Sequence, residues 1–335
     1  MALAGSVRGR RAVLSPGYVA ALIGGLVLLG VVIRAIAPER VDWVRAAAVV
    51  FGSLVVQAMP FVLVGALAAA VIEVFVPISV FERIGRLPRP LRLPAAAFAG
   101  MAFPICECGS VPVARQLMLR GLPPSAAVTF MLAAPVMNPI VIVSTIYAYA
   151  GRDVLWTMVL GRAGLGLLVS MTVGWVLGAR RREDLLRAVG SEPSAVELGP
   201  PEPRLRRLAV HLAGDFLFLG RYLLLGAAVA AAVQTFLPQR ALTGIAATPI
   251  VDALLLMLLA GVLSLCSESD AFIAASFARF GPSAQLAFLV FGPMVDLKLG
   301  ALYAATFRRR VVVTIVVVVA VVTLIGATWI GVLTG

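Results

Sequence analysis

The chain has 335 residues, of which 61% are hydrophobic and 13% are charged, and its mean hydropathy is +1.03. A soluble globular domain does not reach these values, so the composition excludes that class. It predicts an all-α polytopic membrane protein, because lipid offers no partner to free backbone amides and the apolar runs do not alternate as barrel strands would.

The net charge of +12 comes from arginines that lie between the hydrophobic segments. They do not form the basic face, interleaved with aromatic residues, that nucleic-acid binding requires, so no nucleic-acid partner is expected. Basic loops stay in the cytoplasm of a bacterial-type plasma (inner) membrane, which predicts a multi-pass chain with a cytoplasmic N-terminus. One lysine and one histidine exclude a nucleotide-binding P-loop and a His-Glu-x-x-His protease site. We therefore expect no enzyme and no cofactor.

Segment 1–42 joins basic residues to an apolar run and predicts a first transmembrane helix over about 17–37 that runs outward. The first unit of a predicted repeat occupies 43–150 and begins with a helix that returns to the cytoplasm. A connecting transmembrane helix over 151–179 must end inside, at Arg180, so an odd number of crossings precedes it.

Residues 94–120 fit this parity best as a re-entrant hairpin that enters and leaves on the cytoplasmic side, because Pro104, Gly109 and Pro112 interrupt the apolar run. The sequence FPICECGSVP, residues 103–112, is its turn and is called the first tip below. Non-helical backbone at membrane depth is tolerated only against protein or a water-filled cavity, so the tip should line one.

The second half repeats this pattern in the opposite orientation. A cytoplasmic linker, 180–207, leads to a second repeat unit over 208–307, and a C-terminal transmembrane helix occupies 308–335. Within the second unit, 249–280 is expected to form a hairpin entered from outside. Its turn, SLCSESDA at 264–271, is called the second tip. The prediction is about seven full spans and two re-entrant hairpins.

Sequence similarity between the two units supports this pairing. Two pairs of segments align without gaps. Residues 59–77 align with 220–238, and residues 123–139 align with 281–297. The second pair matches Pro135 with Pro293 and Asn138 with Asp296. Inverted repeats whose broken segments meet near the midplane are the plan of many secondary transporters.

Three cysteines lie at the two tips, Cys106 and Cys108 in the first and Cys266 in the second. An extended Cys-x-Cys segment separates its two side chains by about 7 Å, and thiolates select soft metal ions and metalloids. If the tips meet, three sulfurs could hold a trivalent metalloid or a soft metal. Free cysteine is also a common small apolar residue in membrane helices, so packing alone is the alternative.

Charged residues at membrane depth form a second group. Each costs about 2.5 to 3.5 kcal/mol at a helix centre, so they should pair or face a cavity. Glu107, Glu268 and Asp270 lie at the tips and are candidates for substrate or ion contact. Lys298 is the only lysine, and lysine loses its proton more readily than arginine when buried. We predict that Asp296 and Lys298 form a proton-coupling or gating pair; the alternative is a lysine that extends to the membrane surface.

Two further candidates lie in APVMNP, residues 134–139, where Pro135 and Pro139 free backbone carbonyls. Pro135 and Asn138 are therefore assigned to the substrate path, with a structural kink as the alternative reading. A homo-oligomer is left open.

The segment 103–145, together with CSESDAFIAASF and FGPMVDLKLG, resembles the ArsP-type predicted permease family from about residue 45 onward. The resemblance implies efflux of trivalent organoarsenicals such as methylarsenite, with Cys106, Cys108 and Cys266 on the substrate path. The residues and the resemblance together predict a secondary permease that exports a soft, thiol-reactive substrate with proton coupling. The alternatives are a permease for another soft metal ion or a sulfur compound, and an intramembrane thiol redox protein.

Overall fold

The computed structural model describes residues 41–75, 87–102, 105–178, 182–187, 204–236, 248–277 and 279–334. Within these ranges the chain is almost wholly helical, and its one β-bridge joins Leu186 to Phe307. The helix expected over 17–37 lies outside the described residues, as does most of the linker. Residues Val49–Gly335 form one compact unit, and the contacts below belong to it.

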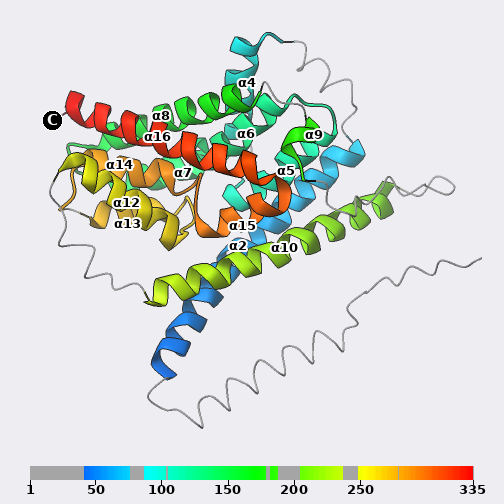
Figure 1. The fold of residues 1–335 in the computed structure, drawn as a ribbon, viewed down its shortest axis with the longest axis horizontal. Helices are drawn as coiled ribbons and strands as arrows, with labels where there is room; N and C mark the ends of the chain where they lie inside the picture. Colours follow the sequence, from blue (N-terminus) through cyan, green and yellow to red (C-terminus); the bar gives the residue numbers. More distant parts are fainter. Residues whose placement is uncertain are drawn as a thin grey trace, which may run out of the picture. The chain divides into compact units, whose positions relative to one another are not determined.

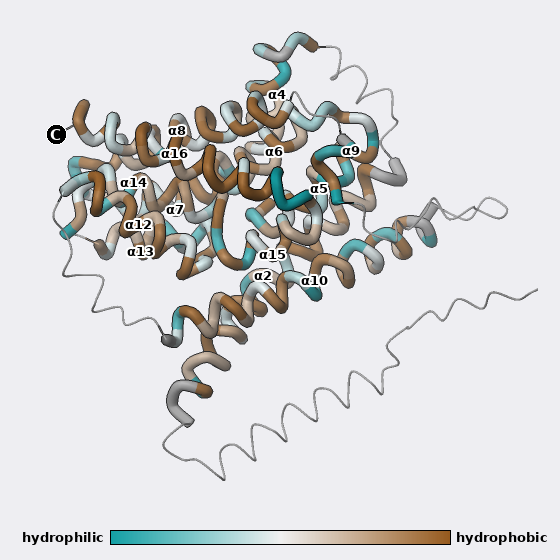
Figure 2. The backbone as a smooth tube through the Cα atoms, in the orientation of Figure 1, coloured by the Kyte–Doolittle hydropathy of each residue, from teal (hydrophilic) through white to brown (hydrophobic). Residues whose placement is uncertain are grey.

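Five helical segments of the described chain are long and apolar enough to cross a membrane. They lie in α2 (Val41–Phe75), α6 with α7 (Pro124–Met137 and Pro139–Ala148), α8 (Leu155–Leu177), α10 (Arg204–Phe236) and α16 (Arg309–Thr334). Figure 2 shows hydrophobic residues along most of each of these helices. The all-α polytopic class is thereby confirmed.

Shorter helices lie between these spans (Figure 1). They are α4 (Arg89–Ala102), α5 (Glu107–Leu119), α9 (Arg182–Leu185), α12 (Pro249–Leu263), α13 (Asp270–Ser276), α14 (Pro282–Phe291) and α15 (Leu297–Thr306). The first tip joins α4 to α5, and the second tip joins α12 to α13. Two helices therefore occupy the range of each predicted hairpin, and whether each pair forms a re-entrant hairpin in the membrane stays a prediction.

Two apolar segments are interrupted at the positions that the sequence alignment matched. Asn138 separates α6 from α7, and its side-chain oxygen accepts the N–H of Ile140. Asp296 precedes α15, and its carboxylate accepts the N–H of Leu299. Such caps satisfy the free amides at a helix start. The apolar run 283–306 is not one continuous helix, because the chain leaves the helix after Phe291, close to Gly292 and Pro293.

The helices on either side of each interruption pack alike. In the first half α6 packs on α4, α5 and α8; in the second half α14 packs on α12, α13 and α16. The halves also contact each other reciprocally, since α5 packs on α15 and α13 packs on α7. This matched packing supports the predicted internal repeat, while its inversion across the membrane stays a prediction.

Close glycine contacts bring α2 and α10 to this core. A Cβ atom added to Gly65 of α2 would lie 2.5 Å from the Cα atom of Gly109 in α5. A Cβ atom added to Gly226 of α10 would lie 3.0 Å from the Cα atom of Lys298 in α15. The two glycines, matched in the sequence alignment, therefore let long helices approach the two short helices that carry charged site residues.

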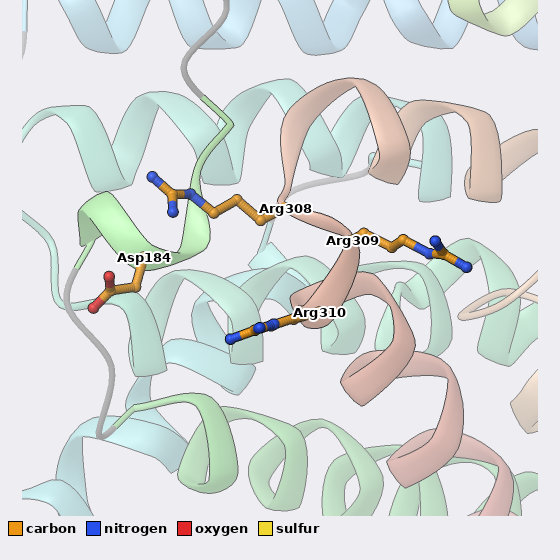
Figure 3. A pocket seen from close by; sticks show the side chains of 4 residues that line it. All are labelled: Asp184, Arg308, Arg309 and Arg310. Carbon is orange, nitrogen blue, oxygen red and sulfur yellow. The ribbon is translucent and has the colours of Figure 1, made fainter.

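Residues 182–187 of the predicted linker contact the start of α16. In α9, Leu185 accepts the N–H of Arg308, and Arg187 donates its N–H to Thr306. A pocket of about 490 Å³ beside this contact is lined by Asp184, Arg308, Arg309 and Arg310. Arg308 and Arg310 extend toward the side on which Asp184 lies, and Arg309 extends away (Figure 3). The pocket shares no lining residue with either tip.

Candidate functional site

The first tip enters α5 through an extended residue. Cys106 has φ −74° and ψ 175°, and its carbonyl accepts the N–H groups of Gly109 and Ser110. Pro112 is the sixth residue of α5, where its missing N–H leaves the carbonyl of Cys108 without its regular partner four residues on. Residues 105–112 are all buried, so the Cys-Glu-Cys sequence lies within protein. Phe103 and Pro104, the first residues of the tip, lie outside the described residues.

The second tip turns sharply where α12 ends. Ser264 adopts a left-handed conformation with φ 47°, and the carbonyl of Cys266 accepts the N–H groups of Ser269 and Asp270. A non-glycine residue in this region is strained, and such strain is concentrated at ligand sites and hinges. Cys266 and Ser267 are buried, whereas Glu268 is half-buried.

The two tips touch. The hydroxyl of Ser267 donates a hydrogen bond of 3.1 Å to Oε2 of Glu107, although 160 residues separate them in the sequence. This contact places Cys266, the neighbour of Ser267, beside the segment in which Cys106 and Cys108 flank Glu107. The condition on which the sequence interpretation relied, that the tips meet, is therefore fulfilled.

Lys298 joins the first tip to α15. Its Nζ atom donates to Oε1 of Glu107 at 3.0 Å and lies 3.9 Å from Oδ2 of Asp296. The lysine side chain is 1% exposed, so it does not extend to the membrane surface. Asp296 and Lys298 do lie together as predicted, but Glu107 is the closer partner of the lysine.

Arg162 of α8 anchors the second tip. Its guanidinium donates to Oδ2 of Asp270 at 2.8 Å, to the carbonyl of Ser267 at 3.1 Å and to the hydroxyl of Thr145 at 3.0 Å. The ion pair is buried on both sides. The sequence analysis did not assign Arg162 to the site. Its position as the only charged residue within Leu155–Leu177 was the available signal.

Several carboxylate oxygens in this cluster are buried without a hydrogen-bond partner. They are Oε1 of Glu268, Oδ1 of Asp270 and Oδ2 of Asp296. An unpaired buried oxygen is costly, and native proteins keep few of them. The cluster therefore has unused acceptors for a proton or another ligand.

The three thiols are free and at most 1% exposed. Among the described residues no group of three or more His, Cys, Asp or Glu side chains is gathered closely enough to hold a metal ion. The tips thus bring the cysteines into one region without forming a ready metal site, so joint ligation by Cys106, Cys108 and Cys266 requires movement of at least one tip.

Pro135 and Asn138 lie at the break between α6 and α7 and are buried. The side-chain oxygen of Asn138 caps the start of α7, so this residue stabilises the break between α6 and α7. It contributes to the site through α7, which carries Thr145 to Arg162 and packs against α13.

Apolar spans that enclose a paired, buried charge cluster at two interrupted segments are the features of a multi-pass membrane transporter. Residues 44–332 match the model of the ArsP_1 family, described as a predicted permease, and the chain belongs to this family. It is 39% identical over 280 residues to the UPF0718 protein YcgR of Bacillus subtilis, covering 83% of this chain and 94% of that protein.

A second relative, from Streptococcus mutans, is 32% identical over 288 residues, which cover 85% of this chain and 94% of the relative. Its name includes the words two-component membrane permease complex subunit. No solved structure matches the chain. Family membership favours a transporter over an enzyme and agrees with the resemblance noted in the sequence.

Proposed function

We propose that this protein is a secondary permease of a bacterial-type inner membrane that exports a soft, thiol-reactive substrate, with trivalent organoarsenicals as the first candidates. The observation that carries this proposal is the hydrogen bond between Ser267 and Glu107, because it brings the thiols of both tips into one buried region. Thiols are the ligands that soft metalloids prefer.

Capture needs no outside oxidant or base. Methylarsenite carries two hydroxyl groups on arsenic, and exchange with two cysteine thiols forms two As–S bonds while both hydroxyls leave as water with the thiol protons. Arsenic stays trivalent throughout. Cys106 and Cys108 supply the two thiols. Once the tips rearrange, Cys266 replaces one of them by thiol exchange, in which its proton passes to the departing cysteine and arsenic keeps two As–S bonds and its methyl group.

The remaining site residues serve coupling and access. Asp296, Lys298 and Asp270 are assigned to proton coupling, and Glu107 and Glu268 to contact with the substrate path. Pro135 and Asn138 are assigned to the flexible break that lets α6 and α7 move relative to each other. The N-terminus is placed in the cytoplasm by the positive-inside rule. The name of the streptococcal relative supports a second membrane subunit as a partner.

A soft metal ion other than arsenic, or a sulfur compound, is the second candidate substrate. The three buried free thiols support it, because thiolates also select soft metal ions. Both candidate substrates bind the same thiols, so one accumulation assay that compares the substrates distinguishes them.

The test is accumulation of methylarsenite, arsenite and Zn²⁺ in an arsenic-sensitive bacterial host that expresses the chain, together with its partner subunit where one is required. Wild type should lower methylarsenite accumulation, and Cys106→Ser, Cys108→Ser and Cys266→Ser at equal expression should not. Lower accumulation of Zn²⁺ alone would assign the site to the second candidate. Unchanged accumulation of all three would overturn both.

A further inference from the structure

The buried cluster contains one lysine between two carboxylates. Nζ of Lys298 is bonded to Glu107 at 3.0 Å and lies 3.9 Å from Asp296, and all three side chains are at most 1% exposed. If both acids were ionised, this triad would carry a net negative charge in a region of low dielectric. Arg162 does not neutralise it, since its hydrogen bonds go to Asp270, Ser267 and Thr145.

The oxygens of the two acids differ in how they are satisfied. Glu107 accepts from Lys298 at one oxygen and from Ser267 at the other. Asp296 uses one oxygen to cap α15, while Oδ2 is buried and has no hydrogen-bond partner. An unpaired buried carboxylate is strongly disfavoured and takes up a proton instead. Asp296 is therefore the carboxylate of the triad that is left without a counter-charge.

Among the described residues, Lys298 is the one cation that acts on Asp296. The charged and titratable groups that face it are Glu107 from α5 and Lys298 and Tyr303 from α15, and the Tyr303 hydroxyl donates to the carbonyl of Met294. The helix α10, packed on α15, presents Gly226 at Lys298. Lysine has a long flexible side chain, so a small rotation brings Nζ from Glu107 to Asp296.

We propose that Lys298 is a switch shared by Glu107 and Asp296, and that the triad holds one exchangeable proton. The proton is on Asp296 when Lys298 pairs with Glu107, as here, and on Glu107 when Lys298 pairs with Asp296. The functional meaning rests on the proposed permease function: Glu107 lies between the two thiols of the first tip, so a substrate that displaces the tip also displaces Lys298 and moves the proton.

The state of the triad is measurable without any substrate. A protonated carboxylic acid has a carbonyl stretching band in the infrared that an ionised one lacks. We expect this band from the purified full-length protein at neutral pH, and we expect Asp296→Asn, which keeps a capping oxygen, to remove it. Asp153→Asn is the control, since Asp153 is exposed and is not a member of the triad, and it should leave the band unchanged.

Two further variants test the switch itself. In Glu107→Gln the lysine has only Asp296 to pair with, so the Asp296 band should disappear although Asp296 is still present. In Lys298→Met both acids lose their counter-charge, so the band should increase about twofold. A band that persists in Glu107→Gln would overturn the switch, as would a wild-type spectrum without the band.

Spectra in choline and sodium buffers show whether Asp296 holds a proton or Na⁺. A band present in both supports the proton, whereas a band that disappears in sodium would assign Oδ2 of Asp296 to Na⁺ and overturn the proton assignment. The proposed function fails separately, through loss of methylarsenite export in wild type. An intact band with no export would leave the proton on Asp296 but overturn its role in transport.

Discussion

Arg162 connects three segments through one side chain, because its guanidinium contacts Thr145 of α7 and both Ser267 and Asp270 of the second tip. Removing one partner of a buried ion pair leaves an uncompensated charge and is far more damaging than replacing both partners. The residue acts by positioning the tip, and its importance is testable through stability.

We expect Arg162→Leu to lower the free energy of unfolding by about 3 to 5 kcal/mol, because Asp270 is left buried and unpaired. The double variant Arg162→Leu, Asp270→Leu should recover much of this loss. Denaturant unfolding in detergent micelles measures both. Losses that simply add in the double variant would contradict the pairing.

The partners of Lys298 show which contacts the sequence could predict and which it could not. Lys298 was found because it is the only lysine. Its neighbour Asp296 lies 3.9 Å from it, and the coupling role predicted for the pair stays a prediction. Its closer partner, Glu107, lies 191 residues away, and nothing local in the sequence predicts that contact. Buried ion pairs of this kind are fixed by helix packing, which a sequence pattern does not contain.

At the scale of elements, close packing of α2 on α5 depends on Gly65. The three nearest atoms to an added Cβ all belong to the backbone of Gly109, which cannot rotate away as a side chain would. Gly52 lies in the same helix and has nothing within 4 Å of an added Cβ. Alanine at Gly65 can therefore be compared with alanine at Gly52 as its matched control.

Gly65→Ala should displace α2 from the first tip, reduce transport strongly and lower stability. Gly52→Ala should leave transport unchanged and stabilise the helix by about 0.5 to 1 kcal/mol, the usual gain of alanine over glycine. Transport assays and denaturant unfolding of both variants test this. Equal behaviour of the two variants would be incompatible with the close contact.

Sequence patterns predicted some helix breaks better than others. Pro135 and Pro139 marked the break at Asn138, because proline lacks the N–H that a helix interior needs. The break before Asp296 was not predicted, because Gly292 and Pro293 lie within an apolar run long enough for a single helix. The carboxylate of Asp296 caps the start of α15, and this role is apparent only in the structure.

At the scale of the whole molecule, composition and arginine placement predicted the membrane class, and the described spans confirm it. The matched packing of the two halves supports the repeat predicted from sequence. Orientation in the membrane rests on the charge rule alone, since no helix contact distinguishes inside from outside.

Accessibility mapping tests that orientation. In a background with Cys106, Cys108 and Cys266 replaced by serine, we expect Arg120→Cys to react only from the cytoplasm and Asp153→Cys only from outside. Membrane-impermeant maleimide applied to cells and to everted vesicles makes the measurement. Labelling of both positions from one side would exclude the re-entrant hairpin at 94–120.

The central claim is that the thiols of the joined tips carry a soft substrate under a proton gradient. Its most direct test is uptake of methylarsenite by everted membrane vesicles with an imposed pH gradient, comparing wild type with Cys106→Ser and Asp296→Asn. We predict uptake that depends on the gradient in wild type, no uptake in Cys106→Ser, and uptake that no longer responds to the gradient in Asp296→Asn. Undiminished uptake in the serine variant would contradict the claim.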